Sequence, residues 1–566
     1  MKIINKIVYF NHKVIFFFDI CKYNTFYILE FFMKRNRFLK LYILLISFLF
    51  LSCHQEPKKI LNEITVSVGD KPNSMDPSKI SSINSMIYIN HLFENLTIKD
   101  ENANVVAGAA EKWISSNNNT IYIFYIRTNA KWADGFDLKA DDFVYAWQRT
   151  VDPKTESPLA VYLENIKNAH EIINGNMDKE QLGVKALDDD TLYVELEYPV
   201  PYFDELVCHS AYAPLREDIV SKDENNWSLN ADTMIGNGAF QIVRLDDYRL
   251  VVRKNTDYWN YTNIKADIIN FEFINNPNEA LSLIEKDELY FYNNIPINKK
   301  DELFEKNIAK NAAKTSLYFY EINNRINPLS NPTIRKAISL AIDRNFLIEN
   351  IVKSDDIVAS AIVPYNIKYN GKDFRKEDTK DYFSTKDYNS NIELAKQLLE
   401  EAGYKNTDDF PVIELLTDYG VHLEIANAIK KMLKETLNID IIVTVKPFNE
   451  FMRTRRSGNF DMARRSWAGG YNHPMSFLSL LQKDYLLNEG KYYNPLYDEN
   501  IRNYLTTQDI KYLHLAEKIA IEDTAIIPLF YYNSIVMQSP KLINVTSDNF
   551  GIYNFKNAEI IEDTDD

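Results

Sequence analysis

The chain has 566 residues, which exceeds the usual size of one domain, so two or three domains are expected. Its composition, 46% hydrophobic and 25% charged residues, is that of an ordinary globular protein. The formal net charge of −16 argues against nucleic acid as a partner, because phosphate contacts need a basic face.

The N-terminal region has the pattern of an export signal. From Met33 the chain reads MKRNRFLKLYILLISFLFLSC: four cations, then the apolar run 41–51, then Ser52 and Cys53. The apolar run is too short to span a bilayer and has the length of a secretory core. Its ending resembles a bacterial lipobox, which implies diacylglycerol on Cys53 and a tether to the outer face of a membrane. A plain signal peptide with an incidental cysteine is the alternative.

Residues 1–52 are expected to be a dispensable extension plus this signal peptide, with Met33 as the better-placed initiator. Without them the chain has 56 Lys and Arg against 78 Asp and Glu, a net charge of −22. Cys208 is then the cysteine that remains besides the lipidated one, so no disulfide framework is expected. Residues 53–62 are predicted to form a tether.

The first half of the mature chain is rich in strand patterns. EITVSVGD (Glu63–Asp70) predicts an early strand, and TIYIFYIRT (Thr120–Thr128) predicts another, which ends near a turn at Asp134 and Gly135. LDDDTLYVELEYPVPYF predicts a further strand between the acidic turn Asp188–Asp190 and two prolines.

Helix signals appear in the second half. Asn331 and Pro332 predict the start of a helix over NPTIRKAISLAIDR, whose apolar residues recur at helical spacing. Ser390 and Glu393 have the spacing of a capping box at the start of a second helix, and Gly403 predicts its end.

A strand (Val412–Leu416), a helix (His422–Glu435) and a strand (Ile439–Val445) are predicted next. This order is a βαβ unit, which requires parallel strands covered by helices. The sequence therefore predicts an α/β protein of at least two lobes.

Motifs for catalysis or metal binding are missing from the sequence. The eight histidines are scattered, and neither HExxH nor a Cys/His cluster occurs, so we expect no metal and no cofactor. Nucleotide-binding glycine motifs and the GxSxG elbow are also missing. The acidic runs Asp141-Asp142 and Asp188–Asp190 lie beside turns and are more typical of solvated loops than of a hydrolase site. The sequence favours capture of a ligand over its conversion, with no catalytic residues.

One segment carries a specific resemblance. NAKWADGFDLKADDFVYAWQRTVDPKTESP (Asn129–Pro158) is similar to the diagnostic segment of the peptide/nickel family, family 5, of extracellular solute-binding proteins of ABC importers, and within it to oligopeptide-binding members. PNSMDPS, HLFENLT, GNGAFQI, AKQLLEEAGY and FDMARRSWAGGYNHPMSF extend the similarity from about Glu63 to the end.

The resemblance implies an α/β, two-lobed periplasmic-binding-protein-like fold of type II (three-domain, cluster C) with a hinge. Lobe I would comprise residues 63–93, 218–315 and 529–566, an accessory domain would comprise 94–217, and lobe II would comprise 316–528. The hinge would close the lobes over an extended peptide and exclude water. The implied function is a lipid-anchored, monomeric receptor of the periplasm that delivers oligopeptides to ABC permease subunits.

The resemblance also implies where the peptide lies. Its backbone would pair with the chain near Ser82 and Ile83 and along Ser466–Ala468, a mode that tolerates many peptide sequences. Glu321 would line the cavity, or else pair with a nearby arginine. Trp467 and Phe448 would form pocket walls, although core packing would explain either one equally well.

Five arginines fall within thirteen residues of this acidic chain: Arg453, Arg455, Arg456, Arg464 and Arg465. Guanidinium groups grip carboxylates bidentately, so a cleft for peptides of varying length would use several cations. By register with the family, four residues would receive the carboxylate of peptides of different length: Arg464, Arg455, His422 and Lys353. Arg453 and Arg456 are expected at the surface, and ion pairing within the protein is the alternative for the others.

One family residue is missing. The family motif ends ADYN, and its aspartate salt-bridges the peptide's α-ammonium, whereas this chain reads GGYN with Gly470 in that place. Leu159 also replaces an aromatic residue near the same end of the peptide. We therefore expect the ligand's amino end to be blocked, displaced, or held by another carboxylate such as Glu321 or Asp418.

Other ligands and functions stay open at this point. Within the family they are a muropeptide, a signalling peptide or a nickel chelate, and nickel is the weakest because paired histidines are lacking. From other classes, the tether and acidity suit a surface adhesin, and the aromatic residues and carboxylates suit an exported glycoside hydrolase.

Overall fold

The structure is a computed structural model that describes residues 8–10, 13–15, 62–80, 82–312, 315–377, 382–383 and 387–561. Met1–Ile60 and Leu61–Asp566 form separate compact units. In the first unit, β1 (Val8–Phe10) pairs with β2 (Lys13–Ile15). The predicted signal peptide, Cys53 and the tether up to residue 61 lie outside the described residues. Among the helices that are described, none combines the length and apolarity needed to cross a membrane.

A seven-stranded sheet is formed by strands that lie far apart in the sequence of the second unit. Its order is β10 (Phe240–Leu245), β11 (Arg249–Lys254), β12 (Ile268–Glu272), β3 (Glu63–Ser67), β13 (Phe291–Tyr292), β23 (Ser534–Gln538) and β14 (Ala309–Ala312). The predicted early strand is confirmed as β3, which lies parallel to both β12 and β13. Because β3 is buried at Ile64 and Val66, it forms the centre of this lobe.

A four-stranded antiparallel sheet forms a second layer. Its order is β6 (Ala110–Ser116), β7 (Ile121–Ile126), β9 (Thr191–Glu195) and β8 (Val184–Asp188). Side chains of β7 alternate between buried and half-buried, which is the predicted strand pattern. Helix α3 (Ala140–Val151) covers the sheet, and its Trp147 donates a hydrogen bond to the Tyr212 carbonyl at 2.9 Å. The acidic run 188–190 is exposed and comprises the last residue of β8 and the turn to β9.

A buried carboxyl group in this layer gives the fold a pH dependence. Oε1 of Glu164 lies 2.7 Å from Nδ1 of His170, within hydrogen-bond distance. Burial raises the pKa of Glu164 from 4.5 to about 7. Between these values the folded chain binds more protons than the unfolded chain, so stability falls as the pH rises through this interval.

We expect Glu164→Gln to flatten this fall, because the amide cannot ionise. Urea unfolding of both proteins across the interval from about pH 4.5 to about pH 7 measures the slope. An equal slope in the variant would contradict the assignment to Glu164.

A six-stranded sheet forms the other lobe. Its order is β16 (Ile357–Val358), β22 (Ile526–Tyr531), β15 (Leu317–Ile322), β21 (Met462–Trp467), β19 (Ile413–Thr417) and β20 (Ile441–Val445). Helix α13 (Val421–Leu437) connects β19 to the parallel β20, so the predicted βαβ unit is confirmed. Strand β22 runs across the predicted boundary between residues 528 and 529.

Of the two helix caps predicted in this lobe, one is confirmed and the other is wrong. Helix α9 (Pro332–Leu340) begins after Asn331, whose side chain accepts from Thr333 N as predicted. Helix α12 (Tyr388–Glu401) is capped by Asp387, which accepts from Ser390 N, so Ser390 is not the cap. Asp387 precedes the apolar pattern by one more turn, and its carboxylate satisfies one free N–H group of the first turn.

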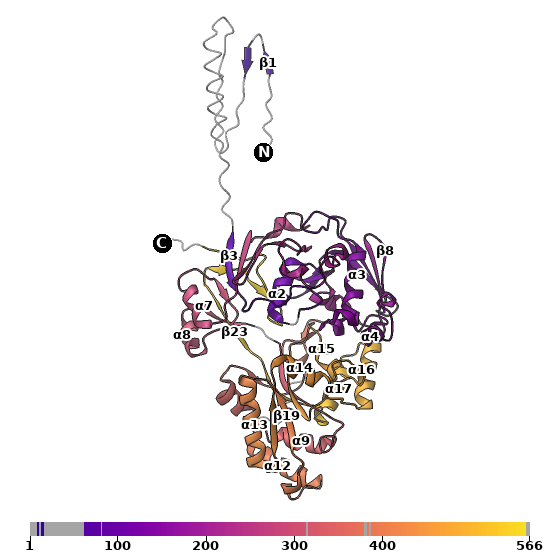
Figure 1. Cartoon of the computed structure of the whole chain (residues 1–566), viewed down its shortest axis with the longest axis vertical. Helices are drawn as coiled ribbons and strands as arrows, with labels where there is room; N and C mark the ends of the chain where they lie inside the picture. Colours follow the sequence, from indigo (N-terminus) through magenta and orange to yellow (C-terminus); the bar gives the residue numbers. More distant parts are fainter. Residues whose placement is uncertain are drawn as a thin grey trace. The chain divides into compact units, whose positions relative to one another are not determined.

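Figure 1 shows the two lobes of the second unit, one around β3, α2 (Ile83–Leu92) and α3, and the other around β19, α9, α12 and α13. The sheets are joined where β14 and β23, paired at Ala312 and Ser534, continue into β15 and β22, paired at Leu317 and Tyr531. The two-lobed α/β fold is therefore confirmed, and the described segment 532–533 is a short connection between the sheets. Such connections are where hinge-type binding proteins absorb domain rotation.

Candidate functional site

Arg464 and Arg465 are neighbours on β21, but their side chains lie on opposite faces of the sheet and contact different residues. Successive side chains of a strand point to opposite faces of the sheet. Arg464 lies opposite Tyr320 of β15, and Arg465 lies opposite Phe319. The two guanidinium groups accordingly belong to two separate polar clusters.

The first cluster surrounds Arg464. Its Nε donates to Oδ1 of Asp418 at 2.6 Å, and its Nη2 donates to the other carboxylate oxygen. The guanidinium also lies 4.7 Å from the ring centre of Phe451. Bidentate pairs of this kind are among the stronger polar contacts in proteins. Arg464, predicted to receive a ligand carboxylate, is thus already held in place by Asp418.

Several polar atoms beside this pair have no partner. The ring of His422 stacks on Tyr318 with centres 5.6 Å apart, and burial together with the Arg464 charge lowers the pKa of His422 to about 4. Nδ1 of His422 and the hydroxyls of Tyr318 and Tyr320 are buried without a hydrogen-bond partner among the described residues. Buried polar atoms are normally satisfied, so these atoms are exceptions in the core beside the Arg464 cluster.

The backbone of β21 presents a free edge next to these atoms. Strand β15 pairs with β21 along its whole length, from Met462 to Trp467. On the other side, β19 pairs with Met462 and Ala463 only. Beyond Ala463 this edge has no strand neighbour in the described part of the chain, and it includes Ser466 and Trp467 of the predicted Ser466–Ala468 segment. The Ser466 hydroxyl lies 2.8 Å from the hydroxyl of Tyr532, which holds that side chain in place.

The second cluster surrounds Arg465 and is fully buried. Arg465 pairs with Glu321 at 2.8 Å, and Arg455 pairs with Glu489 at 2.7 Å. Glu321 also accepts from the backbone N–H of Gly490 at 2.8 Å. Arg455, predicted to receive the ligand, pairs with Glu489 in this structure, and its ligand role stays a prediction. Glu321 pairs with an arginine, which is one of the two alternatives expected for it.

Three other predicted residues lie apart from both clusters. Phe448 begins α14 (Phe448–Arg456) and is 57% exposed, so it does not pack in the core. Lys353 is exposed at the end of the short helical segment Leu347–Val352. Ile83 is half-buried and begins α2. Ser82, the residue before Ile83, has the extended backbone that strand pairing requires, whereas Ile83 is already helical.

Gly470 lies against an aromatic ring. A Cβ at this position would lie 2.3 Å from Cε1 of Tyr162. Tyr162 is held there because its hydroxyl donates to the Gly469 carbonyl at 3.1 Å and its ring stacks on His209 at 4.1 Å. Trp467 adds a further ring 6.4 Å from Tyr162. The packing therefore leaves no room for a carboxylate side chain at position 470.

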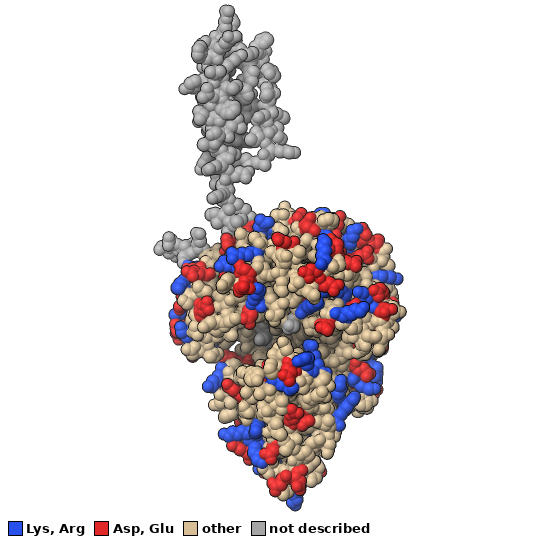
Figure 2. All heavy atoms as spheres, in the orientation of Figure 1, with Lys and Arg blue, Asp and Glu red and all other residues tan. Residues whose placement is uncertain are grey.

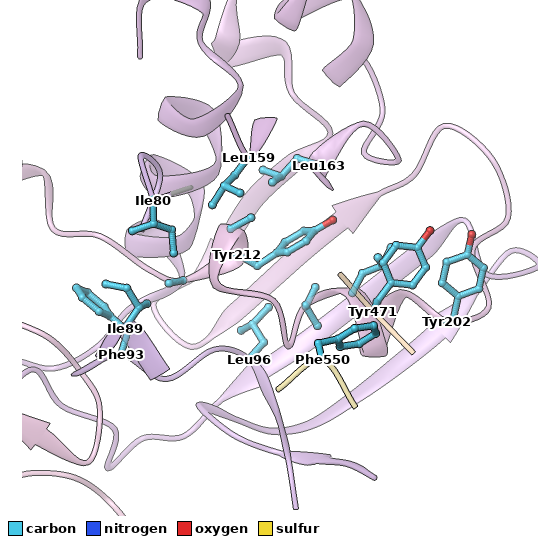
Figure 3. Close-up of a cluster of buried hydrophobic side chains, with 14 of the residues drawn as sticks. Ile80, Ile89, Phe93, Leu96, Leu159, Leu163, Tyr202, Tyr212, Tyr471 and Phe550 are labelled. Atoms are coloured by element: carbon cyan, nitrogen blue, oxygen red, sulfur yellow. The ribbon is translucent and has the colours of Figure 1, made fainter. Parts of the chain in front are cut away.

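Both residues named as a substitute carboxylate are paired with arginines in this structure, and their role toward the ligand's amino end stays a prediction. Asp418 is bound to Arg464 and Glu321 to Arg465. Leu159 packs in the buried cluster of Figure 3, where Tyr471 lies beside Tyr202 at a ring distance of 5.4 Å.

Sequence reasoning missed Tyr162, Tyr318, Tyr320 and Tyr532. The pattern LYFYEI contained a signal for two of them, because residues two apart on a strand share one face. The contacts of Tyr162 and Tyr532 join distant segments, and no local pattern marks them.

The distribution of charged side chains and of potential metal ligands is known for the described residues. Figure 2 shows Lys and Arg interspersed with Asp and Glu over the described residues of the face drawn. No group of three or more His, Cys, Asp or Glu residues among those described is placed to hold a metal ion.

Comparison with known proteins identifies the family. Residues 104–485 match the family described as bacterial extracellular solute-binding proteins, family 5, middle region. The chain belongs to this family. The periplasmic oligopeptide-binding protein OppA of Salmonella typhimurium is 33% identical over 479 residues, which cover 82% of this chain and 86% of that protein. The periplasmic murein peptide-binding protein MppA of Escherichia coli is 32% identical, with 83% and 88% covered.

Solved structures agree over nearly their whole length. The murein tripeptide-binding protein MppA of Escherichia coli superposes with a TM-score of 0.76 at 30% identity, covering 89% of this chain and 99% of that one. Haemophilus influenzae OppA in complex with RPPGFSPFR gives a TM-score of 0.76 at 27% identity, with 89% and 100% covered. The two-lobed fold of this family 5 protein is therefore that of solved solute-binding proteins.

Proposed function

We propose that this family 5 protein captures oligopeptides between its lobes and delivers them to the permease subunits of an ABC importer. The free edge of β21 carries the proposal. An extended peptide added to this edge would bond through main-chain groups, which all peptides share, so binding would tolerate many sequences. The relatives named as oligopeptide- and murein peptide-binding proteins support the same ligand class.

The polar cluster around Arg464 suits the carboxylate end of such a peptide. Arg464 is fixed by Asp418, and its guanidinium group is the kind of donor that binds carboxylates in two-point hydrogen bonds. A preformed donor set loses little entropy when the ligand arrives. The peptide would then run along Ser466–Ala468, with its amino end towards Gly470.

The export-signal pattern of the sequence supports a location in the cell envelope. Lipid on Cys53 would anchor the protein, as a monomer, at the outer face of a membrane, where it meets the permease. We infer a binding role without turnover, because the proposed groups satisfy a ligand and do not include an activated nucleophile.

Mass spectrometry of the ligand that co-purifies, followed by calorimetric titration with tri- to pentapeptides, tests the proposal. We expect peptides in the first measurement and saturable binding of one peptide per chain in the second. Absence of any peptide binding, or turnover of an oligosaccharide, would overturn it.

A further inference from the structure

A cavity of about 380 Å³ adjoins Gly470 and has no role in the site described above. Its walls come from α2, the segment 98–103, residues 205 and 208–210, the segment 258–264, Asn472 and the segment 546–557. The volume lies within the usual range of small-molecule pockets. Since the amino end of the proposed peptide points towards Gly470, that end would arrive at this cavity.

The charged side chains of the lining are mostly acidic. Four carboxylates and two lysines line the cavity: Asp100, Glu101, Glu205, Asp548, Lys99 and Lys556. Each lysine already faces a carboxylate, because Lys99 pairs with Glu205 and Lys556 interacts with Glu94, which lies outside the lining. The excess of negative charge favours a cation in the cavity over a neutral group or an anion.

Asp548 lines the cavity with one carboxylate oxygen unused. Its Oδ1 accepts from the backbone N–H groups of Phe550 and Ile552, both at 2.9 Å, whereas Oδ2 has no hydrogen-bond partner among the described residues. Asp548 keeps accessible surface, being half-buried, and yet loss of hydration raises its pKa from 3.8 to about 6. A carboxylate that is accessible but poorly hydrated lies in a concave wall, where a cation can replace the missing water.

Two charged side chains of other elements face Asp548. Besides the effect of burial, Lys99 of β4 (Thr97–Lys99) lowers the pKa of Asp548, and Glu205 of α5 (Phe203–Leu206) raises it. Tyr553 of β26 (Tyr553–Asn554) also interacts with Asp548, and burial raises the pKa of Tyr553, so its hydroxyl is uncharged. One lysine thus serves two carboxylates, and a second cation beside them would be stabilised by charge pairing.

Both carboxylates are fixed beside the glycine pair that follows β21. Oε1 of Glu205 accepts from the backbone N–H of Asn472, the second residue after this pair, at 2.9 Å. The ring of Phe550, whose N–H bonds Asp548, lies 2.9 Å from where a Cβ on Gly469 would be. Groups that are held in place before a ligand arrives lose little entropy on binding.

We infer that Asp548 and Glu205 hold the α-ammonium group of the bound peptide in this cavity, in place of a carboxylate at position 470. The inference rests on the proposed peptide site, with its amino end towards Gly470. Position 470 has no room for that carboxylate, because a Cβ there would lie 2.3 Å from Cε1 of Tyr162. Oδ2 of Asp548 accepts from the ammonium, and Glu205 adds a second negative charge beside it.

Calorimetry with tri-alanine and N-acetyl-tri-alanine at about pH 7 tests this inference. We expect tri-alanine to bind about tenfold or more tightly, because acetylation removes the positive charge that the two carboxylates would pair with. Equal affinity for the two peptides would overturn the inference and leave peptide capture intact. Failure of both to bind would overturn peptide capture itself, and this inference with it.

The preference for the free amine is expected to depend on pH. The ammonium favours ionised Asp548, so the preference should fall as the pH drops through about 6, where Asp548 gains a proton. Both ends of tri-alanine stay mostly charged between about pH 5 and about pH 7, and the acetyl peptide reports every other effect of pH on the protein. A preference that is constant over this interval would overturn the assignment to Asp548.

Asp548→Asn tests the same assignment with little change in shape. The amide oxygen can still accept from the N–H groups of Phe550 and Ile552, while the charge is lost. We expect this variant to bind tri-alanine about tenfold more weakly, with unchanged affinity for the acetyl peptide. Glu101→Gln is the matched control, because it removes an exposed carboxylate of the same lining and should leave the preference unchanged. An unchanged preference in Asp548→Asn would contradict the inference, and if that variant fails to fold, the pH series with the natural protein decides.

Discussion

Arg465→Met is expected to lower the free energy of unfolding by about 3–5 kcal/mol, because it leaves the buried Glu321 without its guanidinium partner. Arg465 is 2% exposed and also lies 3.9 Å from Glu489, so the loss affects two carboxylates at once. Urea unfolding followed by tryptophan fluorescence at neutral pH measures the change.

Lys431→Met is the control for the loss of a cation. Lys431 pairs with Glu435 at 3.8 Å on the exposed face of α13, and such pairs contribute about 0–1 kcal/mol. The double variant Arg465→Met/Glu321→Leu should recover part of the lost stability, since no unpaired carboxylate remains at position 321. A loss below about 1 kcal/mol in Arg465→Met would show that this cluster is not a main determinant of stability.

Arg464→Gln is expected to weaken the binding of tri-alanine by about 100-fold or more, the usual cost of truncating a buried charge partner. The variant leaves Asp418 negative and unpaired where the ligand's carboxylate is proposed to lie. We therefore expect the natural protein to prefer tri-alanine over its C-terminal amide, and the variant to prefer the amide. Calorimetry with the two peptides measures both affinities.

Arg453→Gln provides the matched control, because Arg453 is an exposed arginine on α14. It should bind both peptides as the natural protein does. Retention of the preference for the free carboxylate in Arg464→Gln would contradict the proposed orientation of the peptide.

Local patterns predicted the elements well where periodicity and capping are strong. The βαβ unit around α13 and the start of α9 at Asn331 needed only helical spacing and turn residues. The cap of α12 was misplaced because Asp387 and Ser390 are both good capping residues, and which of them begins the helix depends on how far its packed face extends.

The sequence by itself determined the α/β order of elements, the two-lobed family fold and the position of an unusual glycine pair after β21. Only the tertiary structure decided what the arginines do, because their partners are remote: Asp418 lies 46 residues from Arg464, and Glu321 lies 144 residues from Arg465. Tyr162, which fills the space beside Gly470, bonds to a residue 307 positions away. Such contacts follow from the packing of whole lobes, so they cannot be predicted from the spacing of residues along the chain.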